Sequence, residues 1–304
     1  MKRWESPLKS LRPAAVICWG LAVLVFLNAM DNQYAYDDVP IIVENIGIQS
    51  LDSLPEALLE PYWPGRYGDG LGLWRPAVTG LLGLEWALFD GNPVGFHLVN
   101  VLLHSGVTVL VVLVLGQLLP VAGAFMAGLL FAVHPVHVEA VANVVGVSEV
   151  LAAFFFLWAC LVLLRGQGRI GPGRTLAILA LYALAFLSKE SAITLLGVVL
   201  LLDSSRTDIR VRELGSYLAR RWPLYGGMIV TAGLILLARH QVLGTLANPY
   251  PPLGATILRE IPRVWTAAAT WPHVFRLFFF PLELSVDYGP AVIPIAFGWD
   301  ATNV

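Results

Sequence analysis

The sequence predicts an all-α polytopic membrane protein that forms a single domain over residues 1–304. Of its residues 57% are hydrophobic and 13% are charged, and the mean hydropathy is +0.72. A soluble domain carries about 25% charged residues, so half that share favours a chain that is mostly embedded in a bilayer. Apolar segments of spanning or half-spanning length recur along nearly the whole sequence.

Several classes of function lack their usual sequence signals. The chain has no glycine-rich phosphate loop after a strand, no Cys-x-x-Cys pair and no basic stripe with interleaved aromatic residues, so no nucleic-acid partner is predicted. Cys18 and Cys160 each lie in an apolar run. They are predicted to be buried small hydrophobic residues without a disulfide or metal role.

The first predicted span is Pro13–Met30, behind an N-terminal segment that carries four basic residues. Its apolar run is longer than the roughly 7–15 residues of a signal-peptide core, so we expect a retained span. The positive-inside rule then places the N-terminus in the cytoplasm.

A long extracytoplasmic loop follows, from about residue 31 to residue 95. Between Asp31 and Asn92 it holds ten Asp or Glu residues and two Arg. Ser53–Leu59 is predicted to be a short amphipathic helix with Ser53 as its N-cap and Pro55 in its first turn. Ala77–Phe89 is too short to span comfortably and is predicted to lie in the membrane interface.

Three further spans are predicted at Gly95–Leu119, Val121–Val133 and Ser148–Leu164. Pro135 ends the second of these, because proline lacks an N–H and restricts the residue before it. The Arg-containing, Gly-rich segment after Leu164 is predicted to be a cytoplasmic loop.

Thr175–Leu202 poses the main question of topology. At about 1.5 Å per residue it is too long for one straight span, and Ser188-Lys189-Glu190 interrupts it. A single span would place the five Arg residues that follow on the outer side, against the positive-inside rule. The sequence therefore predicts a hairpin of two short arms, with Lys189 and Glu190 recessed at its tip, where ionisable groups need a partner or a wet cavity.

The last predicted span is Leu224–Leu237, which places Arg239 on the outer side of the membrane. Val264–Phe280 is interrupted by Pro272 and is predicted to be an interfacial or re-entrant pair of helices. The sequence stops as another apolar segment, Ala291–Phe297, begins, so we expect it to be truncated. Twelve of the nineteen Lys and Arg residues fall on the predicted cytoplasmic side, which places the chemistry on the outer side.

Asp37 and Asp38 are the leading candidates for chemistry. Adjacent carboxylates near a helix C-terminus experience like-charge repulsion and an unfavourable dipole, so at least one pKa is expected to rise. A carboxylate with a raised pKa beside a cavity suits a general base. An ordinary acidic loop is the alternative.

Other polar residues gather on the same predicted face. His97, Asn100 and His104 share one side of a helix, where they either line a cavity or form interhelical hydrogen bonds. His134, His137 and Glu139 are expected to order the cavity mouth, since Pro135 prevents the helical His-x-x-x-His geometry of zinc enzymes. The few outer cations suit the phosphate of an anionic lipid, with snorkelling or pairing to Glu85 or Glu190 as the alternative; they are Arg75, Lys189 and Arg239.

Four sequence blocks occur in an order that resembles the membrane region of the tetratricopeptide-repeat O-mannosyltransferases and their bacterial relatives. More broadly, the blocks resemble the C-type glycosyltransferases. They are Tyr36-Asp37-Asp38 with Ile42–Asn45, Trp74-Arg75-Pro76 and Asn92–His104, then Phe131–Ala142, Leu187–Thr194 and Leu284–Tyr288.

The resemblance implies a C-type helical bundle that uses a polyprenyl-phosphate-linked sugar, typically mannose, outside the cytoplasm and with inversion. By motif, Asp37 would activate the acceptor hydroxyl with Asp38 as its supporting neighbour, while the donor phosphate would be held by Arg75, Lys189 and Arg239. Membrane lipid is an expected partner, and no cofactor is predicted, although a divalent metal stays open. The remaining expected cavity or substrate residues are His97, Asn100, His104, His134, His137, Glu139, Glu190, Asp287 and Tyr288.

Two departures leave alternatives open. The family's Gly-Arg-acidic pattern reads Gly146-Val147-Ser148-Glu149 here, so the substrate differs, another cation substitutes or activity is impaired. The family's C-terminal repeats are not in the sequence, so the extracytoplasmic acceptor is either a Ser or Thr hydroxyl of a protein or a glycan. A transporter of lipid-linked glycans and a non-catalytic membrane subunit are the other classes. The expected location is a bacterial inner membrane with the active site on its outer face.

Overall fold

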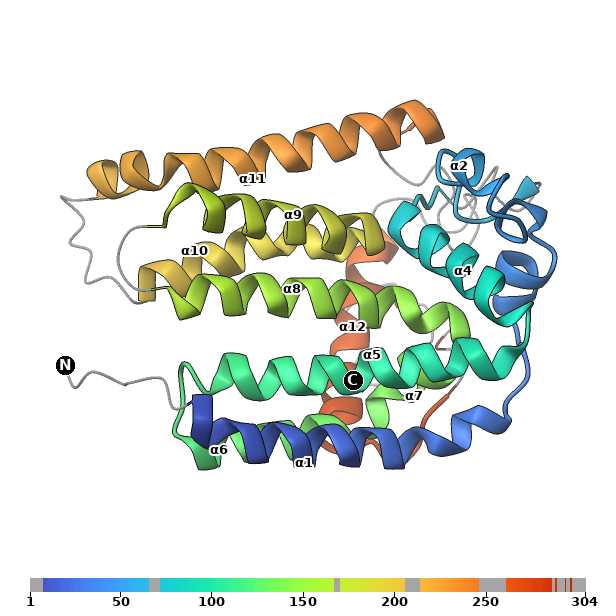
Figure 1. Cartoon of the computed structure of the whole chain (residues 1–304), viewed down its shortest axis with the longest axis horizontal. Coiled ribbons are helices and arrows are strands. Elements are labelled where there is room, and N and C mark those ends of the chain that lie inside the picture. Colours follow the sequence, from blue (N-terminus) through green and yellow to red (C-terminus); the bar gives the residue numbers. More distant parts are fainter. Residues whose placement is uncertain are drawn as a thin grey trace.

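The chain folds as a bundle of roughly parallel and antiparallel helices, one end of which is covered by the long first loop (Figure 1). Every regular element in the described ranges is helical, which confirms the all-α class. By length and apolar composition, four helices among the described residues can cross a membrane, and a fifth crossing results if a bent pair counts as one. The computed structural model describes residues 8–65, 72–166, 170–205, 214–245, 261–285, 288, 293 and 296.

The first three long helices pack together on one side of the bundle. α1 (Leu8–Phe26) continues into a 3-10 turn (Leu27–Asp31), and it packs along α5 (Pro93–Leu115) and α6 (Val121–Val133). Cys18 is buried among apolar side chains of this group, and Cys160 is buried as well, as predicted. The bounds of α6 are those expected from the sequence.

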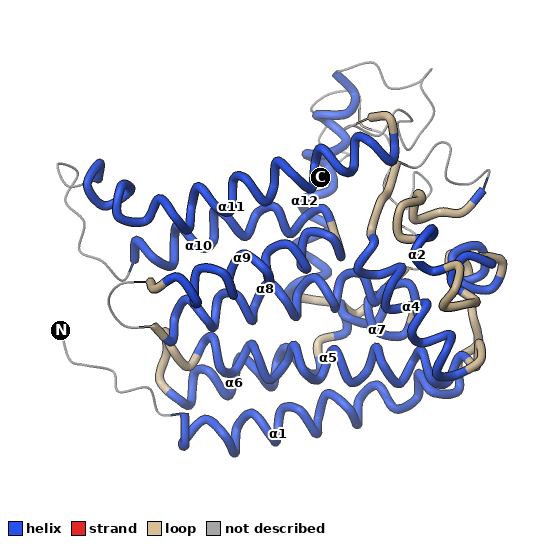
Figure 2. The backbone as a smooth tube through the Cα atoms, turned by 45° about the horizontal axis from the view of Figure 1, so that its top comes forward, coloured by secondary structure: helices blue, strands red, loops and turns tan. Residues whose placement is uncertain are grey.

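Pro135 breaks the chain after α6, as predicted. A 3-10 turn (Pro135–His137) and a short helix α7 (Val138–Ala142) follow, and together they bend by 50° from α6. A second 3-10 turn, Val144–Gly146, then leads into α8 (Val147–Arg165). We call residues 134–146 the broken connection. It lies at the end of the bundle that the first loop covers (Figure 2).

The predicted hairpin is confirmed. α9 (Pro172–Ser188) runs toward the covered end, a 3-10 turn (Glu190–Thr194) reverses the chain, and α10 (Leu195–Ser205) returns (Figures 1 and 2). Lys189 has extended backbone angles (φ −155°, ψ 138°) and separates the two arms. The tip of the hairpin therefore lies at the same end of the bundle as the first loop.

α11 is longer than predicted, because it covers Leu214–Leu243 and contains Pro223. The sequence argument started this span after the proline and left the preceding arginines in a loop. The structure instead buries the carboxylate of Asp203 on α10, where it accepts hydrogen bonds from the hydroxyls of Tyr217 and Tyr225 and pairs with Arg221 at 3.0 Å. This polar network holds the first turns of α11 against α10 and compensates for the polar residues there.

The first loop has its own apolar core. A π-type turn (Val39–Val43), a 3-10 turn (Ile46–Ile48) and a short helix α2 (Leu54–Ala57) fold over α4 (Pro76–Phe89) and the start of α5. The predicted helices are present, but the predicted cap is wrong. The Ser53 hydroxyl donates to the carbonyls of Gly47 and Ser50 and makes no cap hydrogen bond to the first turn.

α12 (Ile261–Phe279) is one helix that continues through Pro272, whereas the sequence predicted a pair. It crosses the direction of the other long helices (Figure 1). Its end contacts the broken connection, because the Nε2 atom of His134 lies 3.0 Å from the carbonyl oxygen of Phe278.

Glu85 on α4 is buried, and neither carboxylate oxygen has a hydrogen-bond partner among the described residues. Burial raises its pKa from 4.5 to about 8. A carboxyl group with a raised folded-state pKa stabilises the fold fully below the unfolded pKa, and this contribution is lost as pH rises through the folded pKa. Between these two pKa values the stability of the wild type should fall by up to about 1.4 kcal/mol per pH unit relative to Glu85→Gln.

Chemical unfolding of both purified proteins at about pH 5 and about pH 8 measures this difference. The Gln side chain is neutral at both values, so the variant serves as the reference for every other titrating group. If the free energy of unfolding changed with pH in the same way in both proteins, the pKa of Glu85 would be the same in the folded and unfolded states, which would contradict the prediction.

Candidate active site

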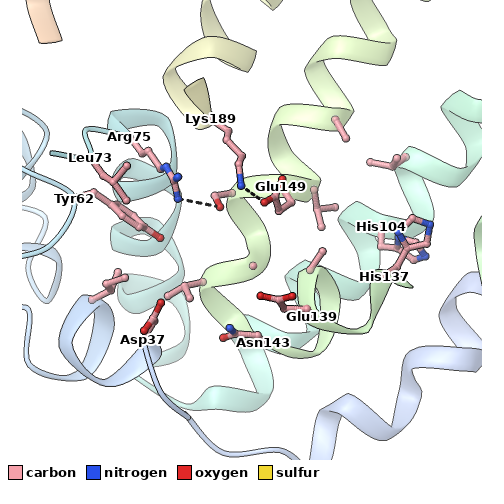
Figure 3. Close-up of a pocket in the computed structure, with 18 of the residues that line it drawn as sticks. Asp37, Tyr62, Leu73, Arg75, His104, His137, Glu139, Asn143, Glu149 and Lys189 are labelled. Atoms are coloured by element: carbon pink, nitrogen blue, oxygen red, sulfur yellow. Dashed lines mark hydrogen bonds and ion pairs between the residues drawn. The ribbon is translucent and has the colours of Figure 1, made fainter. Parts of the chain in front are cut away.

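A cavity of about 580 Å³ lies between the first loop, α5, the broken connection, α8 and the hairpin tip. Charged side chains line one part of it, and two histidines with apolar neighbours line the rest (Figure 3). The charged lining residues are Asp37, Arg75, Glu139, Glu149 and Lys189.

Asp37 lines the cavity and Asp38 does not. Tyr36 has a positive φ of 50°, so the chain turns sharply just before the pair. The 3-10 turn after α1 ends at Asp31, so neither carboxylate sits at the C-terminus of the first span as predicted; Asp38 instead precedes the π-type turn Val39–Val43. The pKa of Asp37 is raised because burial disfavours its charged form, and the predicted direction therefore has a different cause.

Asp38 is 1% exposed and joins two parts of the structure. Its Oδ1 atom accepts the N–H of Val145 at 2.9 Å, and its Oδ2 atom accepts the N–H of Ala35 at 3.1 Å. Burial raises the pKa of Asp38, while these backbone hydrogen bonds oppose the shift. The carboxylate thus fastens the first loop to the broken connection and fixes the backbone next to Asp37.

Two of the predicted phosphate-binding arginines share one carboxylate. Glu190 accepts from Nε and Nη2 of Arg75 at 3.3 and 3.1 Å with one oxygen, and from Nη1 of Arg239 at 3.1 Å with the other. Arg239 also donates to the carbonyl oxygen of Gly72 at 2.5 Å. Arg75 lines the cavity, whereas Arg239 is not among the lining residues. Arg239 therefore acts through Glu190 and the segment that precedes Arg75.

Lys189 lines the cavity and pairs with Glu149 in the first turns of α8. Because successive side chains of an extended segment point in opposite directions, Lys189 and Glu190 reach different partners. Arg75 and Lys189 lie on the same side of the cavity, and Asp37 and Glu139 lie across from them (Figure 3).

The polar face of α5 divides between two roles. Asn100 donates to the carbonyls of Val141, Asn143 and Val144 in the broken connection, which is the interhelical alternative. His97 is fully buried and does not line the cavity, whereas His104 does.

The histidines of the broken connection also separate. His137 lines the cavity and packs against His104, with 5.2 Å between ring centroids. His134 instead accepts the N–H of Val136 and contacts Phe278. Glu139 is an exposed lining residue. Within the described part of the chain, no three His, Cys, Asp or Glu side chains are placed to hold a metal ion.

The fourth motif contributes little to the described cavity. Asp287 lies outside the described residues. The Tyr288 hydroxyl accepts the N–H of Ser285 at 3.0 Å, and Tyr288 is not among the lining residues.

Sequence reasoning missed several polar lining residues, among them Tyr62, Ser148 and Glu149. The buried hydroxyl of Tyr62 has no hydrogen-bond partner among described residues, and the Arg75 guanidinium lies over the Tyr62 ring at 5.2 Å from its centroid. Ser148 accepts a hydrogen bond from Arg75 at 3.4 Å, and Glu149 pairs with Lys189. Ser148 and Glu149 belong to the segment Gly146–Glu149, which differs from the Gly-Arg-acidic pattern of the resembling family. This difference was the available signal in the sequence.

Val147, where the pattern would have Arg, is fully buried in the apolar core of the first loop. Its neighbours in sequence line the cavity, but Val147 does not. In this chain the cations near the start of α8 come from other elements, since Arg75 precedes α4 and Lys189 forms the hairpin tip.

Comparisons with curated proteins find relatives that share the name protein O-mannosyl-transferase. The chain is 31% identical to protein O-mannosyl-transferase Tmtc1 of Drosophila melanogaster over 94% of its own length and 36% of the relative's. It is 31% identical to Tmtc2 of the same organism over 95% and 32% of the two chains, and 33% identical to human TMTC4 over 62% and 29%.

The chain spans about a third of the length of these curated relatives. No family model and no solved structure matches it. The aligned region covers the first loop, the broken connection and the hairpin, which together enclose the cavity. Over nearly all of its own length, the chain is similar to these TMTC O-mannosyl-transferases.

Proposed function

We propose that the chain is a membrane glycosyltransferase that moves a mannosyl group from a polyprenyl-phosphate carrier to a hydroxyl group of a protein. The observation that carries this proposal is the placement of Asp37 across one cavity from Arg75 and Lys189 (Figure 3). A base and two cations on opposite sides are what displacement of a phosphate by a hydroxyl group requires.

The proposed step uses each charge once. Asp37 takes the proton of the acceptor hydroxyl as its oxygen bonds to the anomeric carbon. The bond between that carbon and the phosphate oxygen breaks, and the phosphate leaves with the electron pair. Attack from the side opposite the leaving phosphate inverts the anomeric carbon. Arg75 and Lys189 stabilise the charge that develops on the phosphate.

The names of the relatives support mannose as the sugar and a protein as the acceptor. A lipid-linked donor fits a chain in which candidate spans surround the cavity and no glycine-rich nucleotide loop occurs. We place the cavity at the extracytoplasmic face, because basic residues lie at the opposite end of the bundle near the ends of α8, α9 and α11; among the described residues they include Arg165, Arg174 and Arg221. A bacterial inner membrane stays a prediction.

Transfer of labelled mannose from polyprenyl-phosphate mannose to a Ser- and Thr-containing peptide by the purified chain tests the proposal. Transfer above the level of a boiled sample is expected, with release of one polyprenyl phosphate per mannose transferred. Movement of the donor across liposomes without any transfer would contradict the proposal and would support the transporter class instead.

The pH dependence of transfer activity should report the ionisation of Asp37. Its pKa is raised above the ordinary value of 3.8, and only the deprotonated form can accept a proton. Activity should therefore be lost as pH falls through a midpoint above that ordinary value. The measurement is kcat/KM for transfer between about pH 4 and pH 8. An acid limb centred at or below the ordinary value would mean that another group limits the rate.

A further inference from the structure

The charges that line the cavity do not favour an anionic ligand as they stand. Among the described lining residues, Asp37, Glu139 and Glu149 supply three carboxylates against the two cations Arg75 and Lys189. A sugar-linked phosphate brings a further negative charge. The cavity therefore has to release a cation from its present partner before that cation can bind a phosphate.

Glu190 and Glu149, the two carboxylates that pair with cations at the cavity, differ in how firmly they hold those cations. Glu190 is held by Arg75 and Arg239 through three hydrogen bonds, its side chain is 28% exposed, and it does not line the cavity. Glu149 pairs with Lys189 alone, its side chain is 50% exposed, and it does line the cavity. Exposed pairs with a single partner are weak, so the Lys189–Glu149 pair is the one that can exchange.

We propose that Glu149 is a displaceable counter-ion that occupies Lys189 while the cavity is empty and yields it to the phosphate of the bound carrier. This inference rests on the proposed function, because the phosphate is that of the lipid-linked donor and product. Glu149 is a positioning residue, since it acts through Lys189. Glu190 keeps Arg75 in place throughout.

The exchange also bears on product release. The donor is a phosphodiester with one negative charge, whereas the released polyprenyl phosphate is a monoester with about 1.5 to 2 negative charges at pH 7. The cations therefore hold the product more tightly than the donor. A carboxylate beside Lys189 offers the lysine an alternative partner and weakens this retention.

Isothermal titration of the purified full chain with farnesyl phosphate, a short polyprenyl phosphate, tests the exchange. Glu149→Gln should bind this probe about three- to tenfold more tightly than the wild type, because no counter-ion has to be displaced. Glu139→Gln is the matched control, since it removes one carboxylate from the opposite side of the same cavity without freeing Lys189. Its gain should be less than half as large.

A double substitution separates the exchange from general repulsion. In a Lys189→Gln background, Glu149→Gln should give no gain in affinity, because the lysine through which Glu149 acts is gone. Equal gains with and without Lys189, or equal gains for Glu149→Gln and Glu139→Gln, would overturn the proposal. Neutral farnesol should bind all variants alike, and this binding verifies that each variant is folded. If Glu149→Gln fails to bind farnesol, Glu149→Asp takes its place, and an unchanged affinity for farnesyl phosphate in that variant would also overturn the proposal.

Failure of the wider function gives a different pattern. If no protein in the series binds farnesyl phosphate, the lipid-phosphate donor is wrong and the exchange falls with it. If the wild type binds the probe and Glu149→Gln binds it equally well, the exchange alone is wrong.

Discussion

Replacing Asp37 by Asn should lower the rate of mannosyl transfer by about 100- to 10,000-fold, which is the usual contribution of a general base. Asn has nearly the same shape and cannot accept the hydroxyl proton. Because Asp37 is exposed to the cavity and Asp38 makes the anchoring hydrogen bonds, the fold should persist. The measurement is kcat for transfer, with the thermal unfolding midpoint as a check on structure.

Glu44→Gln is the matched control for this substitution. Glu44 is the next carboxylate along the first loop and is also exposed, but it does not line the cavity. Its variant should keep full activity. Equal transfer by Asp37→Asn and the wild type would remove Asp37 as the base, and equal losses in both variants would point to the charge of the loop as a whole.

Glu190→Gln should lower the free energy of unfolding by about 2 to 4 kcal/mol, which is somewhat less than the cost of breaking a fully buried ion pair. Glu190 is the shared partner of Arg75 and Arg239, whose side chains are 13% and 12% exposed. Without it, two largely buried cations lose their counter-ion. Denaturant unfolding of the purified proteins measures the difference.

Transfer activity should fall as well, since Arg75 loses two of its hydrogen bonds. Glu56→Gln, on the exposed surface of α2, should leave both quantities unchanged. If Glu190→Gln were as stable as the wild type, the two arginines would have to be solvated or paired elsewhere. In that case the arrangement around Glu190 would not determine the position of Arg75.

The helices were predictable because their signal is local. Runs of apolar residues gave the span at Val121–Val133 with its observed bounds, and Pro135 gave the break after it. The hairpin followed from a charge argument about the segments around it. α11 was predicted too short, because a proline and two arginines argue locally against a helix. The buried network at Asp203 that overrides them is a tertiary feature.

The sequence predicted which residues gather at the candidate site, but it did not predict which of them contact one another. Motif order brought Asp37, Arg75 and Lys189 into one expected site, and all three line the cavity. Nothing local indicates that Glu190 binds Arg75, 115 residues earlier, or that Asp38 reaches the backbone 107 residues later. The contrast between Asp37 and Asp38 depends on a turn at Tyr36, and tyrosine is not a residue that signals a positive φ.

The hydrogen bond from Val145 to Asp38 also sets how the cavity can open. It ties the loop that carries Asp37 to the connection that carries Asn143 and leads into α8, so we expect these two walls to move together. Separating them would leave the buried Val145 amide unpaired and would remove one of the two hydrogen bonds of the Asp38 carboxylate, at a cost of about 1 to 3 kcal/mol. At the hairpin tip, the exposed Lys189–Glu149 pair exchanges more readily, whereas Glu190 stays bound to Arg75 and Arg239. Widening of the cavity, and with it the entry of a bulky ligand, is therefore expected at the Lys189–Glu149 pair.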